Sequence, residues 1–252
     1  MNTIVPDSYK DSAHILTGAV FISFSSTWVA WSQVDPVVSA FYRVFFGSLF
    51  LLIYCLLNRA IRPISPKTIT YCALCGLCFA GDLYCWHLSI LYVGPGLATI
   101  LANFQVFILS AVGFIFFKET LGVRFVLSVP AAFFGLFLLV GMDTAELTPR
   151  YIQGVGLGFL AALFYSVFLL LLRRLQSDRL HFSRYYYQMV LSFACAGFLA
   201  AGVHIAGLSF EIPDTQTWFA LIGLGAGSQA LAWVMISAAL PKVYASHAGL
   251  IL

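Results

Sequence analysis

Apolar runs of about 20 residues alternate along the chain with short polar connections. Because an α-helix rises 1.5 Å per residue, a run of this length crosses the roughly 30 Å hydrocarbon core of a bilayer. The pattern therefore predicts eight complete membrane-spanning helices, at residues 14–32, 37–57, 68–91, 95–117, 122–142, 152–174, 185–207 and 216–240.

A ninth apolar run opens near Val243 and continues to Leu252, where the sequence ends. We interpret this run as the start of a ninth span in a chain that is cut short. The connections between runs are short and hold turn-forming residues such as Gly94-Pro95-Gly96, so consecutive helices should run antiparallel. The predicted fold class is an all-α membrane protein, a polytopic helix bundle.

Composition supports this interpretation and excludes other classes. Of the 252 residues, 61% are hydrophobic and 9% are charged, whereas a soluble domain is nearer half apolar and a quarter charged. Because these few charged residues cannot cover the surface of a water-soluble protein, most of the surface must face lipid. The net charge of +3 is small and its basic residues are dispersed, so no nucleic-acid partner is expected.

The distribution of charge predicts the orientation in the membrane. If the N-terminal tail, residues 1–13, is cytoplasmic, eleven of the thirteen basic residues fall on the cytoplasmic side, as the positive-inside rule requires. We therefore expect a multi-pass protein of the cell inner (plasma) membrane. The eleven are Lys10, Arg59, Arg62, Lys67, Lys118, Arg124, Arg173, Arg174, Arg179, Arg184 and Lys242, and the opposite connections hold Asp35, Asp143, Glu146, Glu211 and Asp214.

A weak internal repeat divides the chain into two units. An offset of 147 positions aligns Asp82 with Gln229 and Trp86 with Trp233. The first unit, residues 14–142, contains five spans, so the second unit, residues 152–252 and incomplete, must start on the opposite side of the membrane. Inverted repeats of this kind are typical of secondary transporters, which bind substrate near the midplane.

Several segments of the sequence carry a family resemblance: Asp35-Pro36, Ala40-Phe41-Tyr42-Arg43, Trp86 to Leu101, and Phe116-Phe117-Lys118-Glu119-Thr120-Leu121. These segments resemble the drug/metabolite transporter superfamily, in particular its EamA-type members. The resemblance covers nearly the whole chain and implies two inverted five-helix units and transport of a small metabolite. It also implies an arginine early in the second helix and a glutamate that closes the fourth, here Arg43 and Glu119.

Asp82 is the strongest candidate for a substrate-binding residue. It lies about nine residues, or roughly 13 Å, from the outer end of its helix, too deep for a short side chain to reach the headgroups. Trp86 lies one turn further on the same face, so a cation could meet a carboxylate and an aromatic ring together. Two other interpretations remain open: Asp82 is a structural partner of Arg43, or it is protonated.

The repeat extends this candidate site to the second unit. Gln229 and Trp233 would face Asp82 and Trp86 across one central cavity. Asn103 and Gln105, the amides of the fourth span, should also face the interior, where hydrogen bonding between helices is the alternative to substrate binding. Arg43 and its neighbour Tyr42 complete the predicted substrate-binding set, although Arg43 is also able to reach the interface with its long stem. His87 is a candidate proton relay, with packing as the alternative.

Three classes of function remain. A secondary transporter moving a small organic metabolite, an amino acid or related solute, by alternating access agrees best with the inverted repeat and the polar residues at mid-membrane. A structural or assembly subunit needs neither feature. A membrane-embedded enzyme is disfavoured because the sequence has no catalytic motif such as HExxH, GxSxG or a phosphate loop. No cofactor or metal is expected, and the sequence assigns no oligomeric state.

Overall fold

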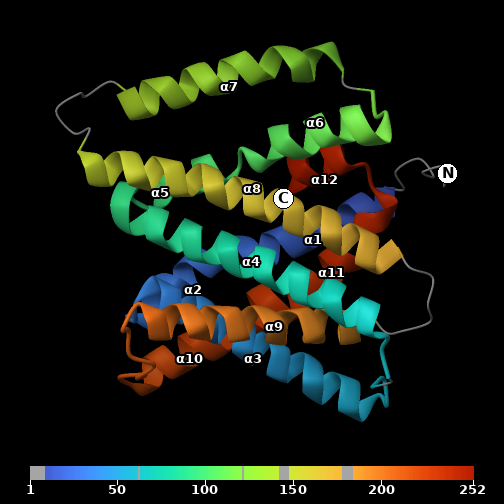
Figure 1. The fold of residues 1–252 in the computed structure, drawn as a ribbon, viewed down its shortest axis with the longest axis vertical. Helices are drawn as coiled ribbons and strands as arrows, with labels where there is room; N and C mark the ends of the chain where they lie inside the picture. Colours follow the sequence, from blue (N-terminus) through green and yellow to red (C-terminus); the bar gives the residue numbers. More distant parts are fainter. Residues whose placement is uncertain (1–8, 62, 121, 142–147, 178–183) are drawn as a thin grey trace.

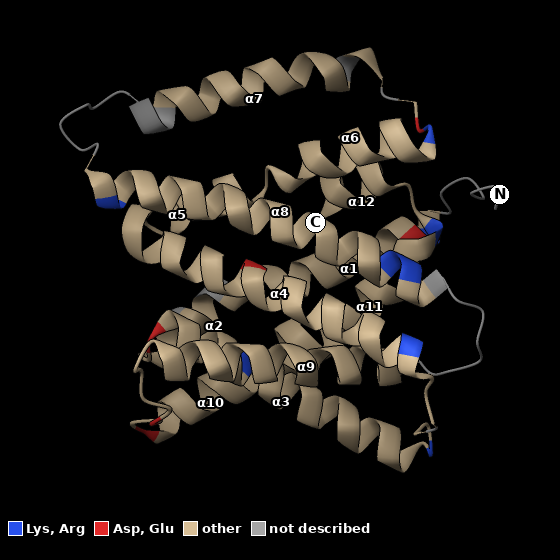
Figure 2. Ribbon diagram, viewed as in Figure 1, with Lys and Arg blue, Asp and Glu red and all other residues tan. Residues whose placement is uncertain are grey.

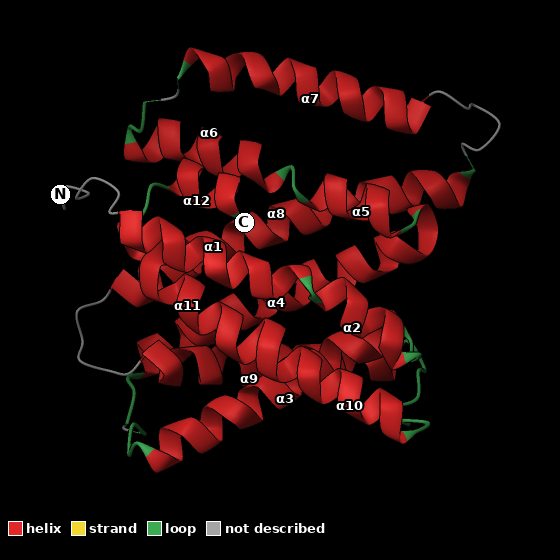
Figure 3. Cartoon of the chain, turned by 180° about the vertical axis from the view of Figure 1, so that it is seen from behind, coloured by secondary structure: helices red, strands yellow, loops and turns green. Residues whose placement is uncertain are grey.

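The chain folds as a bundle of helices. A computed structural model describes residues 9–61, 63–120, 122–141, 148–177 and 184–252. Every regular element within these residues is helical (Figures 1 and 3). The predicted fold class, an all-α polytopic membrane protein, is confirmed.

The helices follow the predicted apolar runs, but several runs are divided. The first run forms two helices that meet at Phe24, the fourth is divided at Asn103 and Phe104, and the eighth contains a π-helical segment. The first half of the chain forms α1 (Tyr9–Ser23), α2 (Ser25–Ser32), α3 (Pro36–Leu57), α4 (Pro66–Val93), α5 (Pro95–Ala102), α6 (Gln105–Phe117) and α7 (Val123–Gly141). The second half forms α8 (Pro149–Ser177), α9 (Arg184–Ile205), α10 (Thr215–Gly223), the π-helix η2 (Leu224–Leu231), α11 (Ala232–Ala239), the short 3₁₀ helix η3 (Leu240–Lys242) and α12 (Ala245–Ile251).

Local capping explains where these helices begin and end. The Asp35 side chain accepts a hydrogen bond from the backbone N–H of Val37 at 2.8 Å, and proline occupies the first turn of α3. Gly94 ends α4 with a φ of 83°, a conformation that favours glycine, and Pro95 then starts α5. The turn signals in the sequence therefore correspond to real helix boundaries.

Within the described residues, six helical stretches are long and apolar enough to cross a membrane. A shorter apolar helix covers residues 125–138. The predicted number of eight spans, with a ninth beginning, stays a prediction. The six stretches are Pro36–Leu57, Pro66–Val93, Pro95–Phe117, Pro149–Gln176, Tyr185–Ile205 and Thr215–Lys242.

The main helix contacts join the first half of the chain to the second. α4 packs along α8, α3 along α9, α1 along α11, and α6 against α12, while α7 lies at the edge of the bundle (Figure 1). These contacts interleave the two predicted units, residues 14–142 and 152–252, whose relation as inverted repeats stays a prediction.

Charged residues gather at the two ends of the bundle. Lys and Arg are concentrated at one end, on the right in Figure 2, whereas acidic residues lie at both ends and in the middle of the bundle. A basic end is what the orientation expected from the sequence requires, and that orientation stays a prediction. Four of the charged residues on which that expectation was based, Arg62, Asp143, Glu146 and Arg179, lie outside the described residues.

One helix crossing is close enough to exclude any side chain beyond glycine. A Cβ atom added at Gly76 of α4 would lie 2.8 Å from the backbone oxygen of Leu191, the backbone nitrogen of Cys195 and the Cβ of Ala194, all in α9. Backbone atoms cannot rotate away as a side-chain tip can, so the two helices would have to separate. Small residues allow this kind of approach between membrane helices.

We therefore expect Gly76→Ala to destabilise the bundle by about 1 to 3 kcal/mol through overpacking. Thermal unfolding of the purified protein in detergent measures this. The matched control is Gly197→Ala in α9, where an added Cβ meets nothing within 4 Å, so its stability should be unchanged or slightly higher. Equal stability of the two variants would contradict the close α4–α9 crossing.

Candidate functional site

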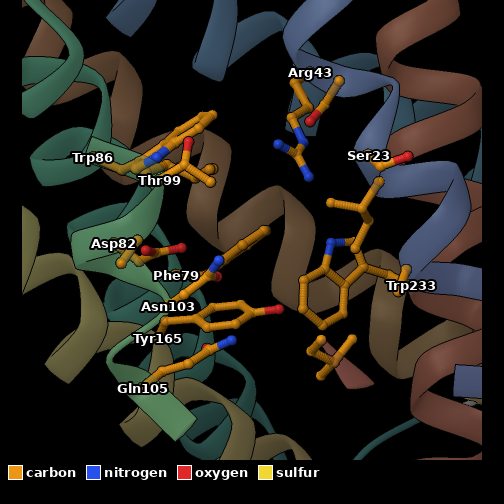
Figure 4. Close-up of a pocket in the computed structure, with 16 residues that line it drawn as sticks. Ser23, Arg43, Phe79, Asp82, Trp86, Thr99, Asn103, Gln105, Tyr165 and Trp233 are labelled. Carbon is orange, nitrogen blue, oxygen red and sulfur yellow. The ribbon is translucent and has the colours of Figure 1, made fainter. Parts of the chain in front are cut away.

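A cavity of about 290 Å³ lies at the centre of the bundle (Figure 4). Asp82 and Tyr165, which line it, are near the middles of α4 and α8, so the cavity is at about half the depth of the bundle. Its lining comes from both halves of the chain: Ala19, Ile22, Ser23, Ser25, Arg43, Phe79, Asp82, Leu83, Trp86, Thr99, Ala102, Asn103, Gln105, Tyr165, Trp233 and Leu252.

Helix irregularities surround this cavity. Ser23 and Ser25 flank the break between α1 and α2, and Asn103 lies in the break between α5 and α6. The π-helix η2 precedes Trp233 by two residues. Broken helices expose backbone groups, which in membrane proteins are tolerated where they are buried in protein or line a cavity.

Asp82 is buried and has no polar partner. Its exposed fraction is 8%, and its carboxylate forms no hydrogen bond or ion pair with any described residue. Figure 4 shows the carboxylate pointing into the cavity. A buried charge without a partner is costly in a membrane protein, so such a residue calls for a ligand, a proton or water in the cavity.

Arg43 enters the cavity from α3 and is only partly satisfied. Its exposed fraction is 4%, its Nη2 donates to the backbone oxygen of Ser228 at 3.5 Å, and its Nε has no partner. This position depends on the close contact of α3 with η2, because a Cβ added at Gly225 would lie 2.9 Å from the backbone nitrogen of Gly47. The guanidinium is therefore held beside the cavity with unused donor capacity.

Trp86 and Trp233 lie on different sides of the cavity (Figure 4). Trp233 is 1% exposed and packs edge-on against Phe79 and Phe168, with ring centroids 5.2 and 5.0 Å apart. The rings of Phe79 and Phe168 are stacked at 4.5 Å. Trp233 thus combines a core role with a place at the cavity wall, where its indole Nε1 lacks a partner.

Three residues of the predicted site do not line the cavity. Gln229 is fully buried and its Nε2 donates to Ser192 Oγ of α9 at 3.1 Å. The hydroxyl of Tyr42 donates to the backbone oxygen of Phe210. The Nδ1 of His87 donates to the backbone oxygen of Leu83, one turn earlier in α4.

The structure adds lining residues that the sequence analysis did not select. Tyr165 of α8 and Thr99 of α5 face the same cavity as the predicted Asn103. Gln105, which the sequence analysis expected in the interior, also lines the cavity; it is 2% exposed and its Oε1 has no partner. Phe79 precedes Asp82 by three residues, so helical spacing offered a signal for it. Tyr165 lies in the largely apolar middle of α8 and had no such signal.

A buried acidic residue ties α6, α8 and α12 together at the end of the bundle rich in Lys and Arg. Glu119 accepts hydrogen bonds from the backbone N–H groups of Ala245 and Ser246, at 2.9 and 3.2 Å, and from Ser246 Oγ at 2.8 Å. Arg173 of α8 lies 3.9 Å away. The carboxylate therefore caps the N-terminus of α12, where helix N–H groups and the helix dipole favour an anion.

The lining of the cavity combines charged and polar groups with aromatic rings. The cavity holds one acidic and one basic side chain, several aromatic rings and two amides. The described residues contain no group of three or more His, Cys, Asp or Glu side chains placed to hold a metal ion. The cavity suits a small solute that forms polar contacts at fixed points and packs elsewhere against rings.

Comparisons with known proteins agree with this description. The sequence model of the EamA-like transporter family matches residues 13–141. A crystal structure of a protein is similar to this chain with a TM-score of 0.72 and 17% sequence identity, and the alignment covers 96% of this chain and 83% of that chain. At this identity the likeness shows the fold alone. A search of curated proteins gave no match.

Proposed function

Because the chain belongs to the EamA-like transporter family, we propose that it is a secondary transporter that moves a small organic metabolite, an amino acid or related solute, across the membrane. The observation that carries the proposal is the central cavity, which contains the unpartnered carboxylate of Asp82. The volume of about 290 Å³ is at the lower end of the range for ligand pockets, which supports a small solute.

In an alternating-access mechanism, the side-chain contacts that close one side of the cavity would act as a gate. On one side, the rings of Phe79, Phe168 and Trp233 pack together, and further along Glu119 joins α6 to α12. In the proposed mechanism these contacts separate when the cavity opens toward the predicted cytoplasmic side. The two predicted repeat units would then rock against each other around the bound solute.

A structural or assembly subunit accounts less well for the same features. Such a protein gains nothing from an acidic side chain that is 8% exposed and faces a cavity without a partner. Burial of an ionisable group inside a membrane bundle costs roughly 2.5 to 3.5 kcal/mol on insertion scales. A role in substrate binding explains why an ionisable residue occupies this position despite its free-energy cost.

Counterflow in proteoliposomes tests the proposal. The purified full chain is reconstituted, vesicles are loaded with a panel of unlabelled metabolites including amino acids, and uptake of the same labelled metabolites is followed. We expect transient accumulation of at least one solute in loaded vesicles and none in protein-free vesicles. Absence of counterflow for every solute would contradict a carrier.

We also propose that the protein is a plasma-membrane protein with a cytoplasmic N-terminus. A cysteine placed at Lys67, in the first turn of α4, should then be protected in intact cells from a membrane-impermeant thiol reagent, whereas a cysteine at Glu211 should react. The parent chain supplies the background, since five of its six cysteines are buried and Cys78 is partly exposed. The opposite labelling pattern would reverse the topology.

A further inference from the structure

We propose that the cavity binds its solute as a zwitterion, with the cationic group of the solute at Asp82 and the anionic group at Arg43. This inference rests on the proposed function and specifies the chemistry of its substrate. Asp82 and Arg43 are the charged side chains among the sixteen residues that line the cavity, and they have opposite sign. Both point into it in Figure 4.

Arg43 and Asp82 attract each other across the cavity but do not form an ion pair. No nitrogen of Arg43 lies within 4.0 Å of a carboxylate oxygen of Asp82, the limit for an ion pair. Arg43 has one long hydrogen bond, to the backbone oxygen of Ser228 at 3.5 Å, and Asp82 has none. Each buried charge therefore has room for an external partner, and the space between them is the cavity.

Solutes of other charge types leave one or both groups unsatisfied. A cation would pair with Asp82 but place a second positive charge near Arg43, and an anion would do the reverse. A neutral solute would desolvate two opposite charges without neutralising either, which is costly in a low-dielectric interior. A zwitterion neutralises both groups while leaving the net charge of the cavity unchanged.

The aromatic lining indicates how the rest of such a solute is held. Trp86 lies one helical turn beyond Asp82, so the cationic group is able to contact the indole face as well as the carboxylate. Trp233 and Tyr165, whose ring centroids are 6.0 Å apart, line another part of the cavity. These rings provide an apolar surface for the body of the solute.

Ligands that differ only in their charged groups test whether the cavity prefers a zwitterion, a cation or an anion. The purified chain in detergent is titrated with leucine, methionine and phenylalanine, with the amines that lack their carboxylates, and with the acids that lack their amines, while thermal stability is followed. We expect at least one amino acid to raise Tm by about 3 °C or more near saturation. The matching amine and acid should bind at least about 30-fold more weakly, because each leaves one buried charge unpaired.

Charge removal should change this preference in opposite directions. Asp82→Asn leaves Arg43 as the charged side chain of the lining, so the affinity for the acid should rise relative to that for the amino acid. Arg43→Gln should raise the relative affinity for the amine. Should Arg43→Gln fail to fold, Arg43→Lys and Asp82→Glu retain the charges and should keep the preference for the zwitterion. Glu211→Gln and Arg174→Gln remove exposed charges away from the cavity and serve as controls.

Three results would overturn the inference: an amine or an acid that binds as well as its amino acid, no stabilisation by any ligand, or variants that keep the parental preference. Counterflow separates this inference from the proposed transport. Zwitterion binding without counterflow would contradict the carrier and leave the zwitterion site intact. Counterflow of a singly charged solute, with no zwitterion bound, would do the opposite.

Discussion

Asp82→Asn is expected to lower solute counterflow by at least about 30-fold while the protein still folds and inserts. The amide preserves the size of the side chain but cannot pair with a cationic group. Because the Asp82 carboxylate has no partner among the described residues, its loss breaks no contact within the bundle. Removing an unpaired buried charge should leave Tm unchanged or raise it.

This prediction separates a binding role from the alternative that Asp82 stabilises Arg43. Expression, Tm and counterflow are measured together for Asp82→Asn and for Glu211→Gln, an exposed acidic control. A fall in expression or Tm with normal counterflow per folded molecule would support the structural role. A fall in counterflow alone would support the binding role.

Glu119→Ala is expected to destabilise the bundle by about 2 to 4 kcal/mol. The substitution removes three accepted hydrogen bonds and leaves the first N–H groups of α12 without partners in a buried region. Glu119→Gln should cost less, because the amide oxygen still accepts from Ala245 while the NH₂ group cannot accept from Ser246. Thermal unfolding in detergent ranks the variants.

The matched control for this series is Glu211→Ala, in an exposed connection, which should have parental stability. Ser246→Ala removes the hydroxyl contact to Glu119 and leaves both backbone contacts, so its loss of stability should be the smallest of the series. If Glu119→Ala were as stable as the control, the carboxylate would not hold α6 to α12.

The sequence by itself determined the class of the protein, its family and the approximate position of its helices. These follow from long apolar runs, because a bilayer requires about 20 apolar residues for each crossing whatever the helix packs against. The resemblance to EamA-type transporters is confirmed by the family match over residues 13–141. Helical spacing also placed Asp82 and Trp86 on one face, and both line the cavity.

The repeat alignment did not identify which residues of the second half face the cavity. Trp233 lines the cavity, but Gln229, four residues earlier, contacts Ser192 of α9. Gln229 lies in the π-helix η2, whose i→i+5 hydrogen bonds give it more residues per turn than the regular α4. The spacing that aligns Asp82 with Trp86 therefore does not hold for Gln229 and Trp233.

Only the tertiary structure decided the rest of the site. It brought Tyr165 and Thr99 to the cavity and left Tyr42 and His87 outside it. It also revealed that Glu119 caps a helix more than a hundred residues later in the chain. Helical periodicity shows which residues share a face of one helix. The packing of neighbouring helices selects which face meets the cavity. That packing depends on close approaches between helices, such as Gly47 of α3 against Gly225 of η2.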